Sequence, residues 1–249
     1  MDLNISLAPD ILFNIAGFPV TNTLLWSFVL SIFLMLVFVL IARSLKMIPG
    51  RWQNFIELLV EGSYSFVEST VGPGKKAQRL FPLVFTMFIF VLVANLAVYI
   101  PGQSAISVNN GDGFVPVFRA VMSDYGLVLI MTLVSIIVAQ IVAIITAGPW
   151  KYLGRFINFK SPLAFFLGLM ELVGEIAKIF SLSFRLFGNI FAGEVLGAVM
   201  LLLAPFFMPL PFLFLGLLSA VIQAFVFSVL TLVFISMASE VPEKEEVSV

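Results

Sequence analysis

The sequence has 249 residues, of which 61% are hydrophobic and only 11% are charged, and its mean hydropathy is +1.14. A soluble domain usually carries about 25% charged residues, so the composition excludes an ordinary soluble protein and predicts an integral membrane protein. The formal net charge of -1, without a basic cluster, gives no indication of nucleic-acid binding. Because the chain has no cysteine and no histidine, any proton chemistry must use carboxylates, water or groups of a partner. We expect no cofactor and no metal site.

The apolar runs predict an all-α integral membrane protein, with about five membrane helices in a single membrane domain over residues 1–249. Residues 1–22 form a short lead whose first ten residues carry no Lys or Arg, unlike a signal peptide. A charge-free run of 20 residues follows, which at about 1.5 Å per residue crosses the hydrocarbon core. The predicted spans are residues 23–42, 80–100, 126–147, 163–204 and 212–239, and residues 240–249 form an acidic tail.

The basic residues set the expected orientation. Six of the thirteen lie between the first two spans: Arg43, Lys46, Arg51, Lys75, Lys76 and Arg79. By the positive-inside rule this segment is cytoplasmic, which places the N-terminus outside and the C-terminus in the cytoplasm. Within it, apolar residues recur at helical spacing and predict an amphipathic helix on the membrane surface: Trp52, Phe55, Ile56, Leu59, Phe66 and Val67. That helix is either a simple connection or a docking surface for a partner.

The last two spans are too long for perpendicular crossings. Residues 163–204 contain no proline, and as one helix they would measure about 63 Å, roughly twice the hydrocarbon thickness. This helix therefore either breaks at its glycines or is strongly tilted. Residues 212–239 would measure about 42 Å. Two long helices joined by a proline-rich turn predict a tilted hairpin.

A polar stripe runs along the first helix of this hairpin. Its members are separated by 4, 3, 7 and 4 residues and so share one face: Glu171, Glu175, Lys178, Arg185 and Asn189. Glu194 lies nine residues after Arg185, about 180° round the helix and about 13 Å farther along it. An Arg at the centre of a bilayer helix costs about 2.5–3.5 kcal/mol on insertion scales, so something must compensate for it. The stripe predicts two aqueous entrances separated by a fixed cation.

Several of these residues have more than one interpretation. Arg185 either forms a structural ion pair with a Glu of its own chain or meets a partner from another subunit, and no Glu lies three or four residues from it. Asn95 either bonds to a neighbouring helix or lines a pathway. The small residues around Gly193 and Gly197 either pack against the last helix or admit a helix of another subunit. Gln223 either bonds to Arg185 or lines water.

Two motifs stand out in the long hairpin. The first is Arg185-Leu186-Phe187-Gly188-Asn189 followed by Ala192-Gly193-Glu194, and the second is Ile222-Gln223-Ala224-Phe225-Val226-Phe227 through Leu230-Thr231. Together they resemble the signatures of subunit a of the rotary F-type ATP synthases, and Met237-Ala238-Ser239-Glu240 resembles that family's C-terminal end. The resemblance is detailed from about Ser161 to Glu240, and the earlier spans match in number and order.

The resemblance implies a stator channel against which a ring of c subunits turns, coupling ion flow through two half-channels to ATP synthesis. The chain itself would have no catalytic site and would belong to the H⁺-transporting two-sector ATPase. Its partners would be the c-subunit ring, the peripheral stalk b subunits, the F₁ sector indirectly and the lipid bilayer of a bacterial inner membrane. Arg185 would face the ring carboxylate. The matching half-channel residues are Asn189, Glu194 and Gln223 on the outer side, and Glu171 near the inner side with Glu175 beside it.

The sequence departs from the family's pattern in two places. Ser123-Asp124-Tyr125 stands where many relatives carry a Pro-Thr-Ala-Asp-Asn-like stretch, so that Asp124 is the matching acidic residue at the outer entrance. Gly216 stands where some relatives place a His or Glu facing the Glu194 position. The alternatives are a Na⁺-translocating version of the same subunit, a self-contained ion-coupled transporter, and a membrane scaffold without a channel.

Overall fold

The computed structural model describes residues 9–15, 17–100, 106–109, 114–156, 162–203, 207 and 209–239. Its helices are α1 (Asn22–Ser44), α2 (Arg51–Val71), α3 (Lys75–Ala97), α4 (Tyr125–Ala147), α5 (Pro149–Phe156), α6 (Pro162–Leu203) and α7 (Pro209–Ser239), and the 3-10 turn η2 spans Val121–Ser123. Five of them are long and apolar enough to cross a membrane: α1, α3, α4, α6 and α7. The prediction of an all-α membrane protein with about five spans is confirmed. Residues 1–8 and 16 of the predicted lead, and the whole acidic tail, lie outside the described residues.

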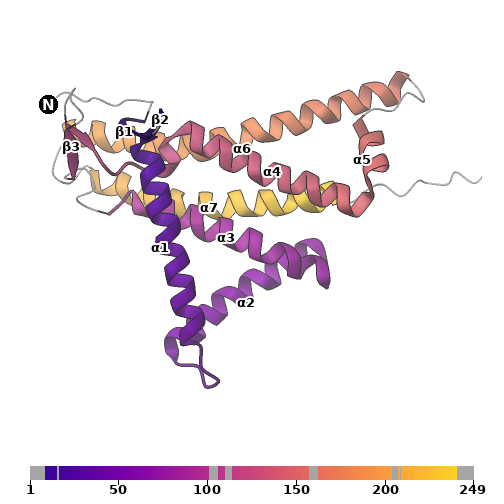
Figure 1. Ribbon diagram of the computed structural model, residues 1–249, viewed down its shortest axis with the longest axis horizontal. Helices are drawn as coiled ribbons and strands as arrows, with labels where there is room; N and C mark the ends of the chain where they lie inside the picture. The colour runs from indigo at the N-terminus through magenta and orange to yellow at the C-terminus, as the bar shows by residue number, and fades with distance from the viewer. Residues whose placement is uncertain are drawn as a thin grey trace, which may run out of the picture.

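Two small antiparallel hairpins, which the sequence analysis did not predict, lie outside the helices. The first pairs β1 (Ile11–Ile15) with β2 (Phe18–Thr21), and the second pairs β3 (Ser107–Asn109) with β4 (Phe114–Pro116). Gly17 takes a φ of 86° at the first turn, a backbone conformation that glycine adopts without a steric cost. Both hairpins lie at the same end of the molecule (Figure 1).

α6 is one continuous helix of 42 residues, so the prediction of an unusually long helix is confirmed and its glycines do not interrupt it. At about 1.5 Å per residue it measures about 63 Å, and it extends along much of the long axis of the molecule (Figure 1). α1 crosses that direction steeply in the same view. Because the two helices run in different directions, they cannot both lie along the membrane normal. The excess length of α6 identifies it as the tilted helix.

α3 starts and ends earlier than the predicted span 80–100. It begins at Lys75, with Pro82 inside it, and gives way to a turn at Val98 and Tyr99. The early end has a local cause, because Pro101 disfavours helical geometry at the residue before it. Tyr99 therefore emerges from the end of α3 rather than lying within the helix.

The core lies where α3, α4, α6 and α7 meet. Small residues such as Ala94 and Ala220 line the extensive contact between α3 and α7, and the Asn95 amide donates a hydrogen bond of 3.2 Å to the Ala220 carbonyl. This settles the two interpretations of Asn95 in favour of a bond between helices. The fully buried side chains of this core include Val91, Ala94, Leu186, Ala220, Ala224 and Phe227.

α1 is attached to the rest of the molecule mainly at its first turn. Only Asn22, Thr23 and Leu30 are buried in it. Thr23 donates a hydrogen bond of 2.7 Å to Asp124, and the Asn22 amide donates one of 3.2 Å to the Pro116 carbonyl. Beyond this point α1 diverges from the other spans (Figure 1).

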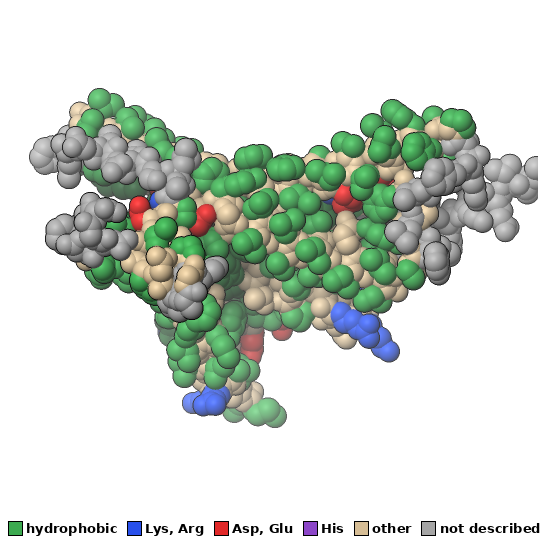
Figure 2. Space-filling model, turned by 45° about the horizontal axis from the view of Figure 1, so that its top comes forward, with side chains coloured by type: hydrophobic (Ala, Val, Ile, Leu, Met, Phe, Trp, Pro, Cys, Tyr) green, Lys and Arg blue, Asp and Glu red, His purple; other side chains and the backbone are tan. Residues whose placement is uncertain are grey.

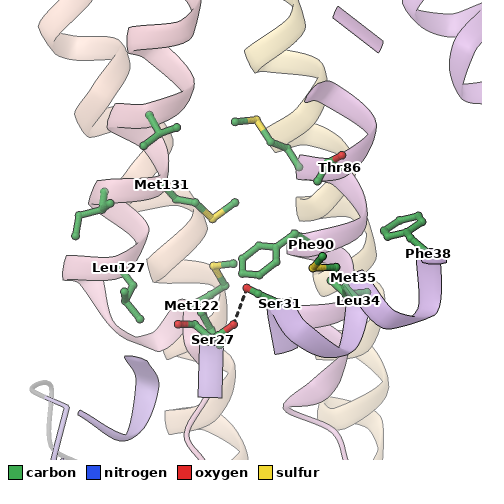
Figure 3. Close-up of a pocket in the computed structure, with 14 residues that line it drawn as sticks. Ser27, Ser31, Leu34, Met35, Phe38, Thr86, Phe90, Met122, Leu127 and Met131 are labelled. Atoms are coloured by element: carbon green, nitrogen blue, oxygen red, sulfur yellow. Dashed lines mark hydrogen bonds between the residues drawn. The ribbon is translucent and has the colours of Figure 1, made fainter. Parts of the chain in front are cut away.

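The divergence of α1 opens a pocket of about 480 Å³ against α3, α4 and η2 (Figure 3). Three of its lining side chains carry hydroxyls, but each donates to a carbonyl of its own helix within 2.6–2.8 Å. The pocket surface is therefore apolar. The hydroxyl residues are Ser27, Ser31 and Thr86, and the methionines of the pocket are Met35, Met87, Met122 and Met131.

α2 confirms the predicted amphipathic helix. It packs on α3 and α7 through a face that buries Val67, and it leaves Trp52, Phe55 and Leu59 exposed. Hydrophobic side chains cover most of the visible face of the molecule, whereas Lys and Arg gather on projecting parts away from it (Figure 2). Nothing in the contacts of α2 distinguishes a connecting helix from a docking surface.

Candidate functional site

Arg185 lies on the face of α6 that points away from its own bundle. The opposite side of the helix is buried, through Leu182, Ser183, Leu186 and Ile190. Arg185 itself is exposed, and among the described residues it makes no hydrogen bond or ion pair. The interpretation of Arg185 as half of an internal ion pair therefore finds no support in the described part of the chain.

The glycines near Arg185 also face open space. A Cβ added at Gly174, Gly188, Gly193 or Gly197 would meet no atom within 4 Å beyond its own helix. Packing of these glycines against α7, which was one interpretation of the small residues, is therefore wrong for the part of the chain that the structure describes. The surface around Arg185 has room for the close approach of another helix.

One turn from Arg185, the hairpin carries a small amide network. Asn189 donates a hydrogen bond of 3.4 Å to the Gln223 side-chain oxygen, and Ser219 donates one of 2.9 Å to the Asn189 oxygen. Gln223 thus contacts Asn189 rather than Arg185. Its Nε2 is buried and has no partner among the described residues. A buried donor of this kind needs an acceptor, and water can supply one.

A second polar group, here called the Glu194 cluster, comprises Glu194, Ser123, Arg119 and Tyr99. Glu194 lies beside Ser123 and Arg119. The Ser123 hydroxyl donates a hydrogen bond of 2.9 Å to the Ala120 carbonyl and accepts one of 3.3 Å from the Arg119 Nε. Tyr99 reaches the cluster from the end of α3. Burial and the charge of Glu194 both raise the pKa of the Tyr99 phenol above its ordinary value of 10.0, so that Tyr99 stays protonated.

A third polar group, here called the Glu175 cluster, joins α4, α5 and α6 on the other side of Arg185. Lys178 forms an ion pair of 2.7 Å with Glu175, and the Gln140 amide donates a hydrogen bond of 2.8 Å to the other Glu175 oxygen. Tyr152 of α5 donates to the Gln140 oxygen. Glu171 lies one turn earlier on the same helix and is half-buried. Glu175 and Glu194 are ten and nine residues from Arg185, about 15 and 13 Å along α6.

Asp124 has a clear structural role. Its Oδ2 accepts the hydrogen bond from Thr23, and its Oδ1 accepts one of 2.9 Å from the Gly126 amide, so that Asp124 caps the start of α4. Both oxygens are engaged, and the side chain is only 8% exposed. Asp124 follows Ser123 of the Glu194 cluster, and its assignment to an outer entrance stays a prediction.

The structure thus gathers the candidate residues into an ordered series. Along α6 lie Glu171 and the Glu175 cluster, then Arg185, then the Asn189 amide network, then the Glu194 cluster. Sequence reasoning missed the functional interest of Tyr99, Arg119, Ser123 and Tyr152. Tyr99 and Arg119 are far in the sequence from Glu194, and the bond of Tyr152 to Gln140 depends on how α5 packs beside α4.

Comparison with known proteins gives one consistent result. The family model described as "ATP synthase A chain" matches residues 24–236. A protein of Moorella thermoacetica, described as "ATP synthase subunit a", is 32% identical over 92% of this chain and 95% of its own. Proteins with the same description from Campylobacter concisus and Geobacter sulfurreducens are 34% and 32% identical over 88% and 86% of this chain, and over 90% and 86% of their own length. The match covers nearly all of the chain, from the start of the first apolar span to the last turn of α7, so the chain belongs to the ATP synthase A chain family.

Proposed function

We propose that this chain is the stator channel of a rotary ATP synthase, in which two half-channels meet at Arg185. The observation that carries the proposal is a cation, Arg185, that has no ion-pair partner among the described residues and lies on an open face of α6 between two polar clusters. A membrane protein retains such a charge where a partner compensates for it. The partner proposed here is a carboxylate on a ring of c subunits that passes along α6. The peripheral stalk b subunits, and the F₁ sector indirectly, would complete the assembly.

The polar clusters supply the two routes in this proposal. Asn189, Gln223 and the Glu194 cluster form the route to the outer side, with Asp124 near its entrance. Glu171 and Glu175 form the route to the cytoplasmic side. The orientation rests on the basic segment between α1 and α3, which favours the cytoplasm and leaves the N-terminus outside a bacterial inner membrane.

Arg185 acts in this mechanism as a fixed charge and not as a proton carrier, because a guanidinium does not release its proton at usable pH. It favours the ionised form of a carboxyl that comes within about 4–6 Å, so a ring carboxyl arriving at Arg185 gives up its proton to one route. The next carboxylate is reloaded from the other route. The same positive charge opposes direct passage of a proton between the two. Each charge moved through 100 mV supplies about 2.3 kcal/mol to the rotation.

The test is ATP-driven acidification of vesicles that contain the whole complex, at matched amounts of assembled subunits. Arg185→Ala should reduce acidification to background, whereas Arg43→Ala at the exposed end of α1 should leave it unchanged. Pumping that survives Arg185→Ala in an assembled complex would contradict the proposal. Repeating the assay with and without Na⁺ distinguishes a proton channel from a Na⁺ channel built on the same residues.

A further inference from the structure

The space beside Gly216 on α7, where another residue would have its Cβ, is occupied by the side chain of Tyr99. A Cβ added at Gly216 would collide with the Tyr99 hydroxyl oxygen, and would lie 3.4 Å from the Tyr99 Cζ and 3.6 Å from Cε1. Residue 216 must therefore lack a side chain for the phenol to hold its place. Gly188, Gly193 and Gly197 on the facing helix show no such contact.

The phenol held against Gly216 belongs to the Glu194 cluster. The charge of Glu194 acts on Tyr99, which is half-buried at the end of α3. On its other sides Glu194 meets Ser123 and Arg119 from the η2 region. Four parts of the chain thus converge on one carboxylate: the end of α3, the η2 region, α6, and α7 through the space at Gly216.

The Tyr99 hydroxyl makes no direct hydrogen bond to another described residue. A water can bridge two polar groups that do not bond to each other directly. A protonated phenol can donate to such a water and fix its orientation. Of the other groups around Glu194, Arg119 favours the ionised carboxylate through its charge, and the Ser123 hydroxyl already donates to the Ala120 carbonyl. Tyr99 is the group placed to order the water that feeds it.

We propose that Tyr99 is a positioning residue of the outer route, which holds a water against Glu194 from the space that Gly216 leaves open. The inference rests on the proposed function. In the direction of ATP synthesis, a proton passes from the water to Glu194: one O–H bond forms at the carboxylate and one breaks at the water, which regains a proton from the next water outward. ATP-driven pumping runs the same step in reverse, so that Glu194 gives its proton to the water. Tyr99 keeps its own proton throughout.

The experiment measures the rate of ATP-driven acidification by the whole complex, in H₂O and in D₂O, with assembly checked for every variant. Tyr99→Phe should slow pumping by roughly two- to tenfold, the effect of losing one hydrogen bond. The ratio of rates in H₂O and D₂O should rise, because proton transfer between Glu194 and water in the outer route becomes the limiting step. A merely structural role would not change that ratio. Tyr64→Phe removes a phenol hydroxyl from α2 and is the matched control, with no expected change.

Gly216→Ala provides the second arm, because its added Cβ displaces the Tyr99 hydroxyl. Alone it should slow pumping as Tyr99→Phe does, and the double variant should be no slower than Tyr99→Phe. Additive losses would overturn the inference. Native rates in Tyr99→Phe, with pumping abolished in Glu194→Gln, would overturn it and leave the proposed function standing. Native rates in Glu194→Gln would overturn the outer route itself and this inference with it.

Discussion

The contact between Thr23 and Asp124 shows how single side chains hold the spans of this protein in register. Thr23 is fully buried, and its hydroxyl donates to a carboxylate that also caps α4. A hydrogen bond to a charged group is worth about 1.5–3 kcal/mol, and removing the donor leaves a buried charge less well compensated. This bond joins α1 to a point one residue from Ser123 of the Glu194 cluster.

Thr23→Val should therefore lower the stability of the subunit by about 1.5–3 kcal/mol, because it removes the hydroxyl and keeps the shape of the side chain. The measurement is the thermal unfolding midpoint of the purified complex, together with the amount of subunit retained in the membrane. Thr70→Val is the control, since Thr70 donates only to a carbonyl of its own exposed helix turn. An unchanged midpoint for Thr23→Val would show that the bond contributes nothing to the assembled protein.

At the scale of the element, the two faces of α6 have different roles: one packs in the bundle, and the other is open. One face is buried against the bundle through residues such as Leu182 and Leu186. The other carries Arg185, with Gly188 and Ala192 in the next two turns, and nothing in the described chain covers the added Cβ at Gly188. A glycine in a helix interior costs about 1 kcal/mol relative to alanine. A glycine that serves no packing within the described chain therefore points to a requirement from outside the chain.

Gly188→Leu separates these two roles of α6. The substitution should leave insertion and folding of the chain unaffected, since it fills open space and favours the helix. Pumping by the whole complex should fall, because overlap at a packed contact costs about 1–3 kcal/mol, or roughly 5- to 150-fold in its occupancy. Gly154→Leu, on the exposed side of α5, is the matched control. Equal pumping by both variants would argue against a close contact at Gly188.

At the scale of the whole molecule, the protein consists of a packed bundle and one loosely attached span. α3, α4, α6 and α7 share the core, whereas α1 adds only Leu30 to its buried residues and is otherwise buried at Asn22 and Thr23, leaving the apolar pocket of Figure 3 beside it. Few buried contacts favour motion of an element. α1 should therefore pivot about Thr23 while the bundle stays rigid.

This can be measured with spin labels, because the chain has no native cysteine to compete with introduced ones. In the chain reconstituted alone in nanodiscs, labels at Leu40 on α1 and Ile145 on α4 should give a wider distance distribution than labels at Ile145 and Leu213 on α7. All three side chains are exposed, so labelling should not disturb packing. Distributions of equal width would show that α1 is as firmly held as the bundle.

The sequence predicted most of the helices because apolar runs of 20 or more residues permit little else in a membrane. It also placed Glu171, Glu175, Arg185 and Asn189 on one face, since helical spacing is a local property. It could not choose between a broken and a tilted α6: the absence of proline permitted continuity, and only packing decided it. The strands of the first hairpin were missed because four or five residues of mixed character carry too weak a signal.

The site was predictable only where residues stand in one helix. Tyr99 and Glu194 are 95 positions apart, and their meeting depends on how α3 ends and on the missing side chain at Gly216. The link between Gln140 and Glu175 likewise requires the packing of α4 on α6. For Gln223, the sequence left a bond to Arg185 open, and the structure directs the side chain to Asn189 instead.

The open face of α6 has a mechanical consequence. Helices that interlock large side chains resist sliding, since each step must lift one knob out of its hole. On the side of α6 that carries Arg185, Gly188 and Ala192 have little or no side chain to interlock with a passing helix. The main attraction on that side is then the charge of Arg185. In the proposed motor, the ring would therefore slide along α6 with little steric resistance and would be held at one position by electrostatic attraction to Arg185. Because no pattern of interlocking side chains has to match between α6 and the ring, such a stator can serve rings with different numbers of subunits.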